Sequence, residues 1–178
     1  DDPNYAFKLG IGLHVYADTW AHQEFAGITS IANVVKDLVV DLFDGDGWKS
    51  LEELEEEIES IGMDLAAPLG HAAAIHWPDR PYAKWKSNVK FPDGRDNTQE
   101  FMEASEEIYG ILASLQCLPS TELPEDKKAL LQKAFQEIKV NDHDKRNEMW
   151  LERIHDNAFQ FADFCDEDAK LAYHQYFI

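Results

Sequence analysis

Residues 14–22 read HVYADTWAH and lie inside a long apolar stretch that decides how we interpret the fold. Asp2 followed by Pro3 is a favourable helix start, and the apolar pattern continues to Phe25, so we predict a helix that ends near Gly27. Large apolar residues occur on nearly every side of this helix: Phe7, Leu9, Ile11, Leu13, Val15, Tyr16 and Trp20. This distribution is typical of a central, buried helix.

Two histidines and an aspartate share one face of the predicted helix. His14, Asp18 and His22 are spaced four residues apart, so they fall within an arc of about 80°. A buried carboxylate is costly unless it is paired or bound to a metal, and histidine with aspartate suits Zn²⁺, Fe²⁺ or Mn²⁺. We therefore predict that this face forms part of a site for a divalent transition metal, with zinc favoured.

The same spacing limits the number of ions. His14 and His22 are separated by about 12 Å along the helix axis, so they cannot bind the same ion, whereas Asp18 could bridge two ions. We expect one or two ions. The alternative is that Asp18 pairs with a histidine and only connects neighbouring helices.

A second group of ligand-type residues occurs in GHAAAIHWPD, residues 70–79. His71 lies in a predicted short helix, whereas His76 and Asp79 lie at its end and in the following turn, because Pro78 disfavours helical geometry in the residue before it. These three residues are further candidate metal ligands. The alternative is that His76 only caps the helix and interacts with its dipole.

Apolar spacing and capping motifs predict further helices along the chain, and we expect Ser50 with Glu53 and Asn97 with Glu100 to cap the starts of two of them. The expected ranges are 30–43, 50–61, 66–75, 97–118, 124–140, 145–161 and 166–177, with residues 78–95 as a loop. We find no strand pattern of substance. The sequence therefore predicts one all-α domain over residues 1–178, a bundle of six or seven helices that includes the buried central helix.

The composition excludes several classes of function. With 16 basic and 35 acidic residues the net charge is −19, so nonspecific nucleic-acid binding through phosphates is not expected. No apolar run approaches about 18 residues, so we predict no transmembrane segment. The stretch 44–53 partly matches a calcium loop, but Leu42 occupies the first ligand position, which favours a solvated acidic turn.

The histidine and aspartate motifs resemble a known superfamily. HxxxD on a helix of a helical chain is similar to the zinc-dependent phospholipase C and single-strand nuclease superfamily, in which such helices supply ligands to a metal cluster. LHVYADTWAHQEFAG followed by GHAAAIHWPDRPYAKW is more similar to an uncharacterised bacterial family that carries a domain-of-unknown-function label, over roughly residues 8–115.

This resemblance implies roles for particular residues. His14 and Asp18 stand where the superfamily has a ligand pair, and His22 stands near its next histidine, which the enzymes usually place farther on. The enzymes also use ligands upstream of this helix. The resemblance therefore implies either that the chain is the C-terminal part of a longer protein or that its cluster is incomplete.

The activity that the resemblance implies is phosphoester hydrolysis, in which a bound metal would lower the pKa of its water to about 7 and polarise a phosphoryl oxygen. His14, Asp18 and His71 would be ligands, and His22, His76 or Asp79 would complete or orient the set. Small phosphoesters or phospholipids would be the substrates, with Arg80 or Lys84 meeting the phosphate: this last role is a hypothesis. The alternative is a non-catalytic helical module that binds metal or a protein partner.

Overall fold

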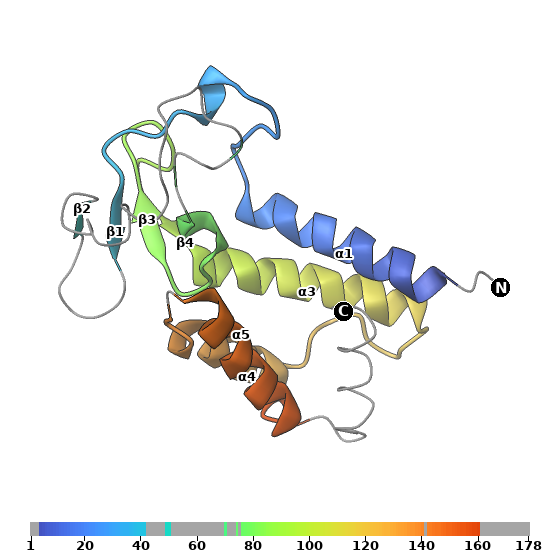
Figure 1. Ribbon diagram of the computed structural model, residues 1–178. Helices are drawn as coiled ribbons and strands as arrows, with labels where there is room; N and C mark the ends of the chain where they lie inside the picture. The colour runs from blue at the N-terminus through green and yellow to red at the C-terminus, as the bar shows by residue number, and fades with distance from the viewer. Residues whose placement is uncertain are drawn as a thin grey trace. The chain divides into compact units, whose positions relative to one another are not determined.

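The computed structural model describes residues 4–41, 49–50, 70, 74, 76–140 and 142–160 (Figure 1). The chain divides into two compact units, Asp1–Glu122 and Leu123–Ile178. Of the predicted helices, 166–177 lies outside the described residues, and so do 51–61 and all of 66–75 except Gly70 and Ala74.

Helix α1 (Tyr5–Ala21) confirms the first predicted helix but not its environment. It lies along α3 (Asn97–Leu115) in the first unit (Figure 1). Its half-buried apolar residues recur three or four positions apart and therefore lie on one side: Leu9, Leu13, Tyr16 and Trp20. On another side Phe7, Ile11 and Val15 are exposed. The prediction of a buried central helix is wrong, because apolar content does not specify which surface another element covers.

The prediction of an all-α fold is also wrong, because the first unit contains an antiparallel sheet. Its strands are β1 (Val39–Asp41), β2 (Lys49–Ser50), β3 (Lys84–Lys86) and β4 (Arg95–Asp96), in the order β2-β1-β3-β4. Val40 pairs with Trp85, which in turn pairs with Arg95. The protein therefore has a mixed α/β fold.

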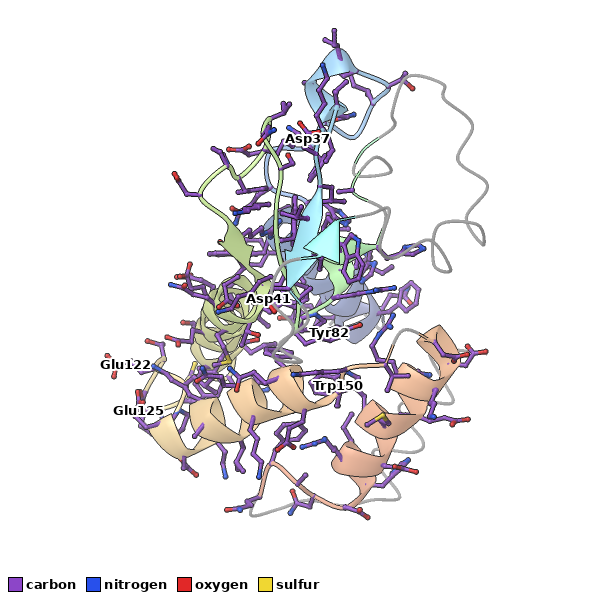
Figure 2. All side chains as sticks on the ribbon, turned by 90° about the vertical axis from the view of Figure 1, so that its left-hand side faces the viewer. Asp37, Asp41, Tyr82, Glu122, Glu125 and Trp150 are labelled. Atoms are coloured by element: carbon purple, nitrogen blue, oxygen red, sulfur yellow. The ribbon has the colours of Figure 1, made fainter. Side chains whose placement is uncertain are left out.

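The sheet replaces two predicted segments. Over residues 30–41, in place of the predicted helix, a 3-10 turn, η1 (Ile31–Asn33), leads through irregular chain with a positive φ at Asp37 into β1. Figure 2 labels Asp37 before this strand and Asp41 at its end. The apolar spacing fitted a helix, but the β-branched residues in this stretch favour extended backbone. The predicted loop 78–95 contains β3 and begins β4, and Ser50, expected to cap a helix, lies in β2.

The core of the first unit is built around Trp85, which is fully buried with Val40, Trp77 and Tyr82. The buried side chain of Asn97 connects this core to the turn η4 (Trp77–Asp79). It accepts a hydrogen bond from Trp85 Nε1 (3.0 Å) and donates to the carbonyl oxygens of Trp77 (2.6 Å) and Arg80 (2.8 Å). Asn97 therefore fixes the turn that carries Asp79.

The second unit contains α4 (Glu125–Glu137) and α5 (His143–His155), which confirms the helices predicted over 124–140 and 145–161. Phe135 of α4 packs edge-on against Trp150 of α5, with ring centroids 5.6 Å apart. Across the described part of both units, no helix is long and apolar enough to cross a membrane.

Candidate functional site

Among the predicted ligands that the structure describes, His22 and Asp79 make the closest contact. His22 Nε2 lies 2.8 Å from Asp79 Oδ1, and the two side chains are 30% and 38% exposed. His22 follows the last residue of α1, and Asp79 is the last residue of η4. The sequence placed them in two separate motifs, and the fold brings them together.

Arg95 holds the end of α1 that carries His22. Its guanidinium donates hydrogen bonds to the carbonyl oxygens of Ala21 (2.7 Å) and Trp20. These carbonyls have no partner within the helix, and a positive charge at this end also interacts favourably with the helix dipole. The backbone N–H of His22 donates to the carbonyl of Asp18 (2.9 Å), so His22 continues directly from the last turn.

Arg95 also interacts electrostatically with acidic residues near the His22–Asp79 contact, Asp79 itself among them. Burial lowers the pKa of Arg95, and the carboxylates of Glu100, Asp79 and Glu24 act in the opposite direction. An arginine nevertheless stays protonated in proteins, so Arg95 is a buried cation that interacts electrostatically with Asp79. Glu100 also accepts a hydrogen bond from Gln23 Nε2 (3.1 Å), next to His22 in the chain.

The other predicted pair, His14 and Asp18, lies one turn apart on α1. His14 Nε2 is 3.6 Å from Asp18 Oδ2, and the side chains are 75% and 50% exposed. The shared face is therefore confirmed. However, a half-exposed carboxylate keeps much of its hydration and does not require a metal, so that part of the reasoning for Asp18 is lost.

The remaining candidates are less well placed. His76 is exposed and precedes η4, while His71 and residues 42–48 lie outside the described residues. Within the described ranges, no three histidine, cysteine or acidic side chains are close enough together to hold a metal ion. The described residues therefore supply ligand pairs, and the complete ligand set stays a prediction.

The two residues suggested for phosphate contact have other partners. The guanidinium of Arg80 lies 4.2 Å from the ring centroid of Trp77, and Arg80 is buried. Lys84 Nζ forms an ion pair with Asp96 Oδ2 (3.0 Å). Neither arrangement supports the hypothesis that these cations meet a substrate phosphate.

Sequence reasoning missed Arg95 and misassigned Asn97. We expected Asn97 to cap the helix that follows, whereas Asp96 does so by accepting from the backbone N–H of Thr98 (3.1 Å). Because Asp96 caps the helix, the side chain of Asn97 forms the buried hydrogen bonds to Trp85, Trp77 and Arg80 instead. Arg95 carries no recognisable motif, and only its contact with the distant end of α1 reveals its role.

The His22–Asp79 contact is chemically versatile. A carboxylate bonded to one imidazole nitrogen fixes the orientation of the ring and raises its basicity, as in acid–base catalysis and around metal ligands. Imidazole nitrogen and carboxylate oxygen are also among the atom types that zinc prefers as ligands. Nitrogen and oxygen ligands of a tetrahedral zinc ion lie about 3.3 Å apart. The His22 and Asp79 atoms, which are 2.8 Å apart, would therefore need to move apart only slightly to bind one ion.

Comparisons with curated proteins and with solved structures found no match. None of the comparisons links the chain to the phospholipase C and nuclease superfamily. The predicted relation to an uncharacterised family is confirmed at that level. A family model matches residues 1–177, and the chain therefore belongs to DUF6765, a family of unknown function.

Proposed function

We propose that this chain is a metal-dependent hydrolase of phosphoesters that binds a divalent transition metal, with zinc favoured, at the His22–Asp79 pair. The observation that carries the proposal is the 2.8 Å contact between His22 Nε2 and Asp79 Oδ1. An imidazole nitrogen and a carboxylate oxygen are both among the ligands that zinc prefers, and these two come from elements separated in the sequence.

The fit to a metal rests on the donor set and on how it is held. Arg95 fixes the end of α1, which carries His22, and Asn97 fixes η4, which carries Asp79, so each of the two candidate ligands lies on a supported element. Ligands that are held in advance lose little conformational entropy on binding. His71 and His76 are the nearest further candidates along the chain, and the His14–Asp18 pair would serve a second ion.

A metal bound here would supply an activated water and a Lewis acid for a phosphoryl oxygen. The chain's own residues orient the site: His22 and Asp79 contact each other, and the buried charge of Arg95 interacts electrostatically with Asp79. Phosphoesters as the substrate class come from the motif resemblance.

The alternative is a non-catalytic module that binds metal or a protein partner. It is favoured by the exposed apolar side of α1, where Phe7, Ile11 and Val15 are 52%, 50% and 56% exposed. Exposed apolar patches on a folded protein commonly mark interaction sites.

The first experiment measures metal content. Protein purified without chelator is analysed by mass spectrometry for transition metals, alongside His22→Ala, Asp79→Ala and the control His155→Ala in α5. We expect the first two variants to retain less than about a tenth of the wild-type metal, and the control to retain all of it. Metal-free wild-type protein that also fails to bind added zinc contradicts the proposal.

The second experiment separates the two functions. Hydrolysis of bis(4-nitrophenyl) phosphate is measured for the same proteins, with circular dichroism to confirm that each variant is folded. Activity that is lost in both His22→Ala and Asp79→Ala supports the hydrolase. Metal-loaded wild-type protein without activity on this or other phosphoesters overturns it and leaves the binding module.

A further inference from the structure

The segment between α1 and β1 contains an uncharged loop, FAGITSIANVV, residues 25–35, here called the isoleucine loop. Ile28 is 69% exposed and Ile31 is 88% exposed. Among the large apolar residues that the structure describes, these two are the most exposed. Figure 1 shows η1, which contains Ile31, at the outer end of this loop, away from α1 and α3.

The loop is braced from inside by Asn33, which is fully buried. Asn33 Oδ1 accepts from the backbone N–H of Ala26 (2.7 Å), and Nδ2 donates to the carbonyls of Ala26 (3.0 Å) and Ile28 (2.8 Å). Ser30 Oγ accepts from the backbone N–H of Ala32 (3.1 Å). The two isoleucines are thus presented by a closed turn, so little ordering entropy is lost when they bind a surface.

The base of the loop is anchored on the turn 87–91. Lys90 Nζ donates to the carbonyl of Glu24 and lies 4.8 Å from the ring centroid of Phe25. Asn88 contacts the chain just after the isoleucine loop. Its backbone N–H donates to the carbonyl of Lys36 (3.1 Å), and its side chain donates to Asp37 Oδ2 (2.6 Å). Figure 2 labels Asp37 at this position below the tip.

The segments that form this base, residues 24–37 and 87–91, carry no net charge. They contain two acidic residues, Glu24 and Asp37, and two lysines, Lys36 and Lys90, whereas the whole chain carries −19. A strongly acidic protein is repelled by anionic surfaces, but here an uncharged tip stands on a locally neutral base. This arrangement is complementary to a surface without net charge.

We propose that the isoleucine loop docks this protein onto a zwitterionic phospholipid surface, with Ile28 and Ile31 inserted into the interface. Apolar side chains insert into the boundary between headgroups and acyl chains, and the hydroxyls of Thr29 and Ser30 between them suit the polar headgroup layer. The proposal does not depend on metal binding or hydrolysis.

The test is co-sedimentation of the full chain with phosphatidylcholine vesicles over a range of lipid concentrations. Burial of one isoleucine side chain contributes about tenfold or more to a partition coefficient, so Ile28→Ser with Ile31→Ser should lower it about a hundredfold. Leu115→Ser, which removes an apolar residue that is 51% exposed at the end of α3, is the matched control and should bind like wild type. Ile31→Trp should bind more tightly, because indole prefers the interface.

Several outcomes overturn the proposal. One is wild-type protein that stays in the supernatant at millimolar lipid, and another is a double serine variant that binds as well as wild type. Binding that needs anionic lipid and disappears with salt would make charge the cause. If wild-type protein instead self-associates in light scattering and the double variant does not, the loop contacts a second copy and not a bilayer.

Discussion

Two histidine–aspartate pairs on or beside α1 use the same chemical groups in different settings. His14 and Asp18 lie one helical turn apart, 3.6 Å from each other, with side chains that are 75% and 50% exposed. His22 and Asp79 lie 57 residues apart in the sequence, 2.8 Å from each other and about two-thirds buried. The local pair follows from helix geometry alone, whereas the distant pair exists only because the fold holds both of its ends. Substitutions of Asn97 and Arg95, which hold the two ends of the distant pair, should therefore change stability more than substitutions within either pair.

The largest expected effect is at Asn97, which supports the Asp79 side. Asn97→Ala leaves Trp85 Nε1 and the carbonyls of Trp77 and Arg80 buried without this partner. Because each unsatisfied buried group costs about 1–3 kcal/mol, we expect a loss of about 3 kcal/mol in the free energy of unfolding. Urea denaturation followed by tryptophan fluorescence measures it.

Asn88→Ala is the matched control, because its side chain bonds to Asp37 at an exposed position. We expect it to change the free energy of unfolding by at most about 0.5 kcal/mol. If both asparagine variants lose the same small amount, the buried network does not hold the turn.

The next effect is at Arg95, which supports the His22 side. Arg95→Met keeps an apolar stem near Phe91 but removes the hydrogen bonds to the carbonyls of Trp20 and Ala21. We expect a loss of about 2 kcal/mol in stability, because hydrogen bonds from a charged group contribute about 1.5–3 kcal/mol. Chemical denaturation gives the value.

Arg95→Lys distinguishes the charge from the geometry. Lysine keeps the positive charge at the helix end but lacks the planar guanidinium that reaches both carbonyls. We expect it to recover about half of the stability that methionine loses. A methionine variant as stable as wild type would show that α1 ends at Ala21 without this cap.

The sequence predicted what depends on local spacing and missed what depends on distant contacts. The shared face of His14 and Asp18 and the helices α1, α3, α4 and α5 follow from periodicity and capping. The strands β1 to β4 have only two or three residues each, too few to show an alternating pattern. In the segment before β1, helical spacing and β-branched composition disagreed, and pairing with β3 decided the outcome.

The candidate site divides in the same way. His22 and Asp79 were identified as separate candidates from their residue types, but their contact requires α1 to end at Ala21 and η4 to be fixed by Asn97. No local motif reports either condition. The exposure of Asp18 was also not predictable, because its burial depends on which element covers that side of α1.

The smallest expected effects are the coupling energies within the two pairs, and they test the comparison directly. In a double-mutant cycle with alanine at both positions, we expect His22 and Asp79 to couple by about 1 kcal/mol, as a partly buried hydrogen bond does. His14 and Asp18 should couple by less than about 0.5 kcal/mol, since exposed pairs one turn apart contribute little. Both cycles are measured by urea denaturation in metal-free buffer with chelator, so that any bound ion does not add to the result. Equal coupling in the two cycles would mean that bridging α1 and η4 adds nothing to the pair, and the case for His22 and Asp79 as the prepared site would then fail.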